Sequence, residues 1–122
     1  MSIRSMLLME EEQIMQIVTD SGTDVSLLPE QMAELNIHVV PLVVTLNGKS
    51  CREGVDIQPG EFYSLLAATD GLPTTSQPSA GDFAKTYRRL ATTDRDILSI
   101  HMMSDLSGTF NAAKAGAELV LN

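Results

Sequence analysis

The sequence contains few basic residues and a single cysteine. Its 122 residues include eight Lys and Arg but sixteen Asp and Glu, so the formal net charge is −8. That charge repels phosphate backbones and anionic lipid surfaces, and it therefore argues against nucleic-acid binding. Cys51 has no second cysteine with which to form an internal disulfide, which is typical of a protein of the reducing cytoplasm.

Sequence motifs for metals, nucleotides and membranes are also missing. The two histidines, His38 and His101, and Cys51 lack zinc-like spacing, and residues 20–24 lack the ligands of a calcium loop. The sequence contains neither Gly-x-Gly-x-x-Gly nor a complete Walker-type Gly-x-x-x-x-Gly-Lys-Ser/Thr, because Gly48-Lys49-Ser50 follows Val43 where the first glycine of that motif would stand. No apolar run approaches the roughly 20 residues that span a bilayer. We therefore expect no metal site, no cofactor and no membrane span.

The chain has the length and composition of one domain. A hydrophobic share of 43% is enough for an ordinary globular core. Residues 1–12 hold a short apolar patch and three glutamates but no secretory cleavage site, and they are interpreted as a disordered leader or an appended tail. Residues 13–122 are predicted to form one α/β domain. We expect it to be incomplete at the C-terminus, because about three parallel strands make a small sheet.

Strand and helix patterns alternate along this domain. Short β-branched and apolar runs predict strands at 14–19, 37–46 and 96–101. Pro41 interrupts the second run and predicts an edge strand or a bend there, and the run precedes the hairpin signal Asn47-Gly48. Apolar residues at helical spacing predict helices at 26–36, 59–69, 79–91 and 109–121. This order predicts a mainly parallel sheet flanked by helices.

Two hydroxyl-rich segments each precede or open a predicted helix. They are residues 74–79 (TTSQPS) and 104–109 (SDLSGT), and neither contains Lys or Arg. A helix start offers unpaired backbone N–H groups and the positive end of the helix dipole, while Ser and Thr add neutral donors. In a parallel sheet such loops lie at the carboxyl ends of the strands, where ligands bind. The pattern predicts a site for a small anionic head group.

Four short segments occur in a distinctive order. They are IVTDS at 17–21, NIHVVPL at 36–42, TSQPS at 75–79 and LSGT at 106–109, with Asp56 and Phe62 between them. In this order and spacing, from about residue 14 to residue 117, the chain resembles the DegV family of bacterial fatty-acid-binding proteins. The resemblance implies the N-terminal subdomain of that family, with its EDD-type fold.

The resemblance also implies a carrier rather than an enzyme. Members of the family hold a long-chain fatty acid, such as palmitate, in an internal tunnel. Some present it to a separate ATP-binding fatty acid kinase subunit. The family closes its tunnel with a C-terminal half that supplies a basic side chain and a histidine near the head group. This sequence has no counterpart of that half, so we expect either a fragment of a longer protein or two copies that complete one pocket.

Two residues correspond to the family's ligand-binding hydroxyls. The Thr of its Thr-Ser-Gln-Pro motif matches Thr75 and the Ser of its Leu-Ser-Gly-Thr motif matches Ser107. The resemblance implies that both hydrogen-bond the fatty-acid carboxylate, which as an ion only accepts hydrogen bonds. Supporting roles are expected for Ser76, Gly108, Thr109, Asp20 and Ser21. The apolar side chains available for the tunnel wall or for the core are Leu42, Val44, Phe62, Leu65 and Phe110.

Three alternatives to ligand carriage are open at this point. The hydroxyls of Thr75 and Ser107 could serve only their own backbone, as turn or N-cap groups. The chain could be a truncated α/β fragment that self-associates through an exposed sheet edge without ligand. It could also be a serine hydrolase with Ser107 as nucleophile, His101 as base and Asp105 as third member, although the Gly-x-Ser-x-Gly elbow is missing.

Overall fold

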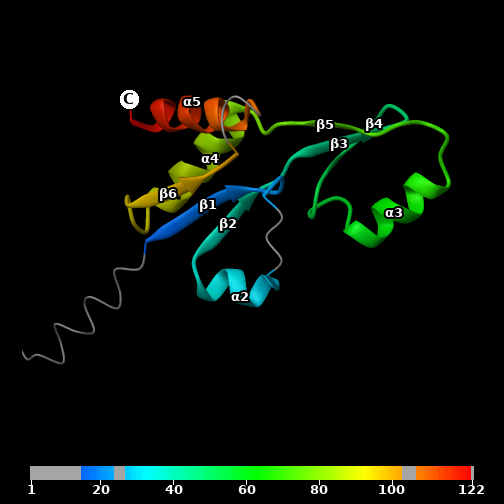
Figure 1. Ribbon diagram of the computed structural model, residues 1–122. Helices are drawn as coiled ribbons and strands as arrows, with labels where there is room; N and C mark the ends of the chain where they lie inside the picture. The colour runs from blue at the N-terminus through cyan, green and yellow to red at the C-terminus, as the bar shows by residue number, and fades with distance from the viewer. Residues whose placement is uncertain (1–14, 24–26, 103–106, 122) are drawn as a thin grey trace, which may run out of the picture.

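The structure describes residues 15–23, 27–102 and 107–121. Their strands form two three-stranded sheets. The structure is a computed structural model (Figure 1). The parallel sheet has the order β2-β1-β6 and consists of β1 (Gln16–Asp20), β2 (Ile37–Val40) and β6 (Ile97–Ile100). The antiparallel sheet has the order β4-β3-β5 and consists of β3 (Val43–Leu46), β4 (Lys49–Arg52) and β5 (Thr74–Ser76). The expected tail, residues 1–12, lies outside the described ranges.

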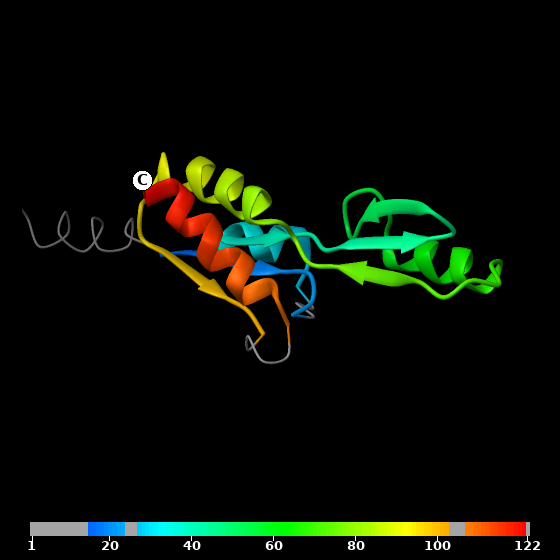
Figure 2. The same cartoon turned by 90° about the horizontal axis from the view of Figure 1, so that it is seen from above.

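The helices confirm the predicted α/β class. α4 (Ala80–Ala91) and α5 (Thr109–Leu121) pack together against the parallel sheet, and α2 (Pro29–Glu34) lies beside β2. α3 (Pro59–Ala67) belongs to the end of the molecule that holds the antiparallel sheet (Figures 1 and 2). The predicted helix at 26–36 is shorter than expected, because it begins at Pro29 and ends at Glu34. Ser26, its expected cap, lies outside the described residues.

Two strand predictions need correction. The apolar run at 37–46 is not one strand, because Pro41 and Leu42 interrupt it and β2 and β3 belong to different sheets. Pro41 has no backbone N–H to donate to a ladder, which is the physical reason for a break at this point. Residues 74–76, expected in a loop, form β5 and pair with β3. The turn signal Asn47-Gly48 is confirmed, since both residues adopt the positive φ values, 52° and 75°, that a tight hairpin requires.

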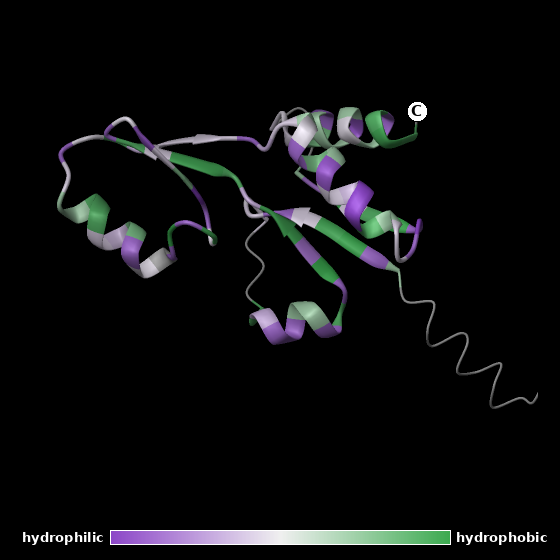
Figure 3. Ribbon diagram, turned by 180° about the vertical axis from the view of Figure 1, so that it is seen from behind, coloured by the Kyte–Doolittle hydropathy of each residue, from purple (hydrophilic) through white to green (hydrophobic). Residues whose placement is uncertain are grey.

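The core lies between the parallel sheet and the α4–α5 pair. The buried residues that form it are Val18, Val40, Phe83, Tyr87, Leu90, Ala112 and Ala113. In α4, the four buried residues Phe83, Ala84, Tyr87 and Leu90 follow the predicted apolar stripe. The predicted capping box is also present: Ser79 Oγ accepts a hydrogen bond from Asp82 N at 3.1 Å, and Asp82 Oδ2 accepts one from Ser79 N at 3.0 Å. Figure 3 shows the apolar character of the strands that face this core.

The two packed helices cross closely at Gly116 of α5. A Cβ atom at this position would lie 2.6 Å from Phe83 Cβ, 2.8 Å from the Ala80 carbonyl oxygen and 3.0 Å from Ala84 N. Two of these atoms belong to the backbone of α4, which cannot turn aside as a flexible side chain can. Only a glycine therefore permits this approach of the two helices.

Gly116→Ala is expected to destabilise the fold by about 1 to 3 kcal/mol, because the added methyl group forces α4 and α5 apart. Gly81→Ala in α4 is the matched control, since a Cβ there meets only Ser79 Oγ, at 3.6 Å. Without a clash, that substitution should stabilise the helix by up to about 1 kcal/mol. Thermal and urea unfolding of the two variants measures both effects. A stabilised Gly116→Ala variant would show that the helices do not cross as described.

Candidate functional site

Thr75 lies in the middle of β5, opposite Val44 of β3. Its side chain is exposed and lines a cavity of about 170 Å³. Four apolar or aromatic side chains and two polar ones complete the lining: Val44, Ile57, Phe62, Tyr63, Glu53 and Gln58. Two of the side chains expected for a tunnel wall, Val44 and Phe62, thus lie beside Thr75. A hydroxyl at the rim of an apolar cavity matches the requirements of an amphipathic ligand.

Ser107 lies two residues before the start of α5, and its hydroxyl hydrogen-bonds to Thr109, the first residue of that helix. Ser107 Oγ donates to Thr109 Oγ1 at 2.9 Å and accepts from Thr109 N at 3.2 Å. Thr109 is almost completely buried, with 2% exposure. In this structure the Ser107 hydroxyl therefore caps the start of its own helix, as one of the alternatives expected. To bind a ligand, Ser107 would have to redirect to it the hydrogen bond that it donates to Thr109.

The two hydroxyl-rich segments contact each other. The side-chain amide of Gln77 lies against Gly108, where a Cβ atom would come within 2.9 Å of Gln77 Cδ and 3.0 Å of Gln77 Nε2. A larger residue at position 108 would push Gln77 away. The fold thereby brings the segment after β5 next to the start of α5, while Ser76 remains an exposed residue of the strand. Residues 103–106, the first part of the second segment, lie outside the described ranges.

The loop that follows β1 is held by two polar side chains. Asp20 Oδ1 accepts a hydrogen bond from Gly22 N at 2.8 Å, so Asp20 orients this loop as expected. Ser21 Oγ accepts from Leu42 N at 2.9 Å and donates to Glu53 Oε2 at 3.1 Å. Ser21 thus connects the first loop to the junction between the two sheets.

Four side chains near the carboxyl ends of β1 and β6 form a chain of hydrogen bonds. Asp20 Oδ2 lies 2.6 Å from His101 Nδ1, His101 Nε2 lies 2.5 Å from Ser99 Oγ, and Ser99 Oγ lies 2.7 Å from the Tyr87 hydroxyl. The side chains of His101 and Asp20 are only 2% and 5% exposed. Phe83 packs edge-on against the imidazole, with ring centroids 5.1 Å apart. Burial raises the pKa of Tyr87, and its hydrogen bond with Ser99 acts in the opposite direction.

This network was not predicted, although the sequence positions of its acidic and imidazole members, Asp20 and His101, indicate that they could meet. Asp20 ends β1, and His101 directly follows β6. Because β1 and β6 pair in parallel, residues at their carboxyl ends meet at the same edge of the sheet. The pairing of β1 with β6, which lie about 80 positions apart, is what the sequence pattern left open.

The structure contradicts the alternative in which His101 acts as the base for Ser107. Both ring nitrogens of His101 are engaged, one by Asp20 and the other by Ser99, so neither is directed at Ser107. Asp105, the proposed third member, lies outside the described residues. Asp20, His101 and Ser99 do follow the connectivity of a hydrolytic triad. However, Ser99 lies inside β6 and shares its hydroxyl with Tyr87, where no nucleophile elbow presents it to a substrate.

Metal binding and membrane insertion find no support among the described residues. Within ranges 15–23, 27–102 and 107–121, the structure groups no three His, Cys, Asp or Glu side chains in a way that could hold a metal ion. In the same ranges, no helix is both long enough and apolar enough to cross a membrane.

Several related proteins share the sequence pattern of the chain. A family model described as an uncharacterised protein of the DegV family matches residues 14–121. A DegV domain-containing 15.5 kDa protein of Staphylococcus aureus is 43% identical over 104 residues, which cover 85% of this chain and 72% of that protein. A DegV domain-containing protein of Listeria innocua is 41% identical over 106 residues, which cover 85% of this chain but 36% of the relative.

Solved structures share the fold. A DegV family protein from Thermus thermophilus, described for its fatty acid binding, has a TM-score of 0.74 and 36% identity, with 88% of this chain and 38% of that chain covered. DegV from Bacillus subtilis, described as a fatty acid binding protein, has a TM-score of 0.75 and 34% identity, with 87% and 37% covered. The chain spans little more than a third of these structures and of the Listeria relative. Both the sequence match and the fold establish that the chain belongs to the DegV family.

Proposed function

We propose that this chain binds the carboxylate of a long-chain fatty acid and presents the acid to a separate ATP-dependent fatty acid kinase subunit in the cytoplasm. Thr75 and Ser107 donate the two hydrogen bonds to the carboxylate, and the backbone N–H groups near Ser76 and Gly108 assist. The descriptions of the Thermus and Bacillus proteins as fatty acid binding support the fatty-acid-binding part of this proposal. The chemical step would belong to the kinase subunit, and this chain would act as a carrier.

One observation carries the proposal. The contact between Gln77 and Gly108 brings the segment after β5 beside the start of α5, which supports a site to which both hydroxyl-rich segments contribute. The apolar cavity beside Thr75 offers the start of a path for the acyl chain. Neutral donors suit a carboxylate, because hydrogen bonds to an ionised acceptor are stronger than those between neutral groups.

Self-association is the second candidate, and a specific feature of the parallel sheet favours it. β6 pairs with β1 on one side only within the described part of the chain. Leu98 and Ile100 of this strand are 46% and 50% exposed. An edge strand with exposed apolar side chains is a template for pairing with another chain.

Native mass spectrometry of the protein purified from bacteria separates the two candidates. A monomer that carries the additional mass of a C14 to C18 acid supports the carrier. A ligand-free dimer that takes up no added fatty acid supports self-association and contradicts carriage by this chain.

Thr75→Val and Ser107→Ala are each expected to weaken fatty-acid binding by about 1.5 to 3 kcal/mol, the range for a hydrogen bond to a charged group. Thr74→Val is the matched control, because neighbouring residues of a strand face opposite sides and Thr74 is likewise exposed. Isothermal titration with palmitate measures the three affinities. Unchanged affinity in both the Thr75 and the Ser107 variant would contradict the site.

A further inference from the structure

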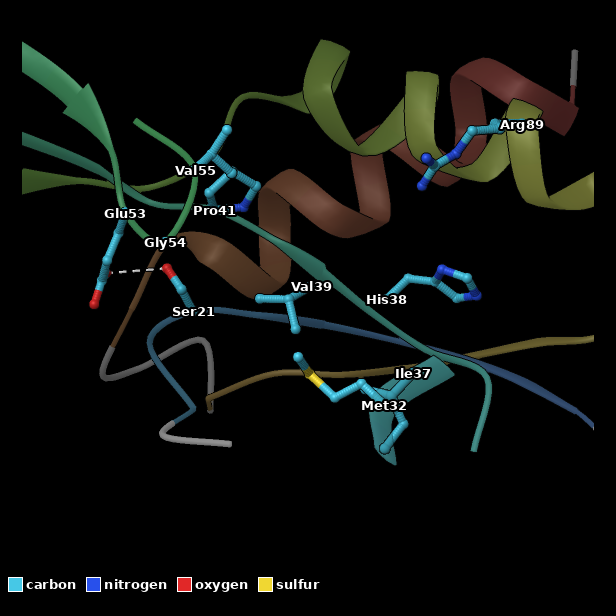
Figure 4. Close-up of a pocket in the computed structure, with 10 residues that line it drawn as sticks. All are labelled: Ser21, Met32, Ile37, His38, Val39, Pro41, Glu53, Gly54, Val55 and Arg89. Carbon is cyan, nitrogen blue, oxygen red and sulfur yellow. Dashed lines mark hydrogen bonds between the residues drawn. The ribbon is translucent and has the colours of Figure 1, made fainter. Parts of the chain in front are cut away.

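A second cavity lies along β2 and reaches Ser21 in the loop after β1. It has a volume of about 520 Å³ and extends from Ser21 and Glu53 at one end to His38 and Arg89 at the other (Figure 4). Its volume falls in the range of small-molecule sites. Neither Thr75 nor Ser107 lines it, and Glu53 is the one lining residue that it has in common with the cavity beside Thr75.

The middle of this cavity is apolar. Met32 of α2, Val39 and Pro41 of the β2 segment, and Val55 from the loop after β4 line it. Figure 4 shows these side chains between the two polar ends. Such a wall favours a ligand with an apolar body, because a fully polar ligand would lose hydration there without compensation.

The end formed by His38 and Arg89 carries the positive charge of Arg89, and among the described residues no acidic one lines the cavity at this end. Arg89 forms no ion pair or side-chain hydrogen bond with them, in contrast to Arg52, which pairs with Asp56 at 3.0 Å. His38 Nε2 is buried without a hydrogen-bond partner in the same part of the chain. Burial lowers the pKa of His38, and the nearby positive charge of Arg89 lowers it further.

A further cation lies one helical turn away. Lys85 lines an adjoining groove of about 390 Å³, which shares Arg89, Val39, Pro41 and Val55 with the first cavity. Lys85 and Arg89 are four positions apart on α4 and therefore lie on the same face of the helix. Arg52 and the carboxylate of Asp82 also line this adjoining groove. Cationic side chains therefore outnumber acidic ones beside the cavity, in a chain whose net charge is −8.

The opposite end of the cavity limits the charge of a ligand. Glu53 lines this end and accepts a hydrogen bond from Ser21. A second anionic group on the ligand would approach the Glu53 carboxylate and be repelled. The ligand therefore has one anionic group, at the Arg89 end, and an uncharged remainder.

We propose that this cavity binds a small monocarboxylate with an apolar body, whose carboxylate pairs with Arg89 while its hydrocarbon part packs on Met32, Val39 and Val55. Arg89 suits this role because its planar guanidinium can bind both carboxylate oxygens. The site is independent of the fatty-acid carboxylate site and would bind a shorter acid. It assigns a ligand-binding role to the outer side of β2.

Hexanoate is the probe that tests this site, and the imidazole NMR signals of the intact chain provide the readout. The sequence has two histidines, and His101 is already held by Asp20 and Ser99, so it serves as an internal reference. Addition of hexanoate should shift the His38 ring signals saturably and leave those of His101 in place. Arg89→Gln should weaken this response at least tenfold.

Arg88→Gln is the matched control, because Arg88 is also exposed on α4 but its guanidinium donates to the Leu119 carbonyl of α5. It removes the same charge from the chain and should leave the hexanoate response unchanged. Equal weakening by both variants, or a His38 signal that does not saturate, would overturn the proposal. Inorganic phosphate that shifts His38 as strongly as hexanoate at equal concentration would also overturn it, because the site would then recognise charge without an apolar body.

Discussion

Asp20→Ala should lower the free energy of unfolding by about 3 to 5 kcal/mol, the cost of removing one member of a buried polar pair. Asp20 is buried and accepts hydrogen bonds from Gly22 N and from the His101 ring. An alanine leaves the imidazole nitrogen without a partner in a place that water does not reach. It also releases the loop after β1. Urea unfolding followed by far-ultraviolet circular dichroism measures the loss.

Two control variants test whether the effect comes from this network. Tyr87→Phe removes only the last hydroxyl of the chain and should cost about 1 kcal/mol, because His101 keeps its bond to Ser99. Asp56→Ala removes a carboxylate that is paired with Arg52 at the surface, and we expect a far smaller change than for Asp20→Ala. If Asp20→Ala were as mild as Asp56→Ala, the buried pair would contribute little to the fold.

Local rules account for the parts of the fold that the sequence predicted. The α4 helix was recognisable because its cap, Ser79 with Asp82, and its apolar stripe both depend on residues within a few positions of each other. The hairpin at Asn47-Gly48 follows from the positive φ that these two residue types tolerate. The parallel sheet itself was predicted from the alternation of strands and helices.

Features that depend on strand pairing between distant segments were not predicted. The run 37–46 has the length and composition of one strand, and only the structure shows that Pro41 separates two sheets. β5 is three residues long, so it is recognisable only by its pairing with β3. The interaction of Asp20 with His101 likewise requires β1 and β6 to be neighbours.

In the candidate site too, local motifs were predicted from the sequence, whereas contacts between distant segments were not. The motif around Thr75 and the motif around Ser107 were found in the sequence, each at the start of a helix or just before it. Their mutual contact through Gln77 and Gly108 is a property of the folded chain. The cavity at Arg89 was not recognised, because it combines side chains from α2, β2, the loop after β4 and α4, which follow no common spacing.

Phe83→Ala should be as destabilising as Asp20→Ala, with an expected loss of about 3 to 5 kcal/mol. Phe83 is completely buried and lies where α4, α5 and the sheet meet. Its ring contacts the rings of Tyr87 and His101, with centroid distances of 6.0 and 5.1 Å. Removing it leaves a cavity that the backbone crossing at Gly116 prevents from closing, because Phe83 Cβ and the α4 backbone already meet that residue.

Phe110→Ala is the matched control, since the same ring is removed from α5 at a position that is 45% exposed. It should cost about 1 kcal/mol or less, as is usual for side chains that are partly in water. Urea unfolding compares the two variants, and the exchange rate of the His101 ring proton adds a second measurement. Phe83 covers this imidazole, so its loss should admit water and accelerate that exchange, whereas Phe110→Ala should not. Equal losses of stability in both variants, with unchanged exchange, would mean that Phe83 neither anchors the core nor shields the Asp20–His101 pair.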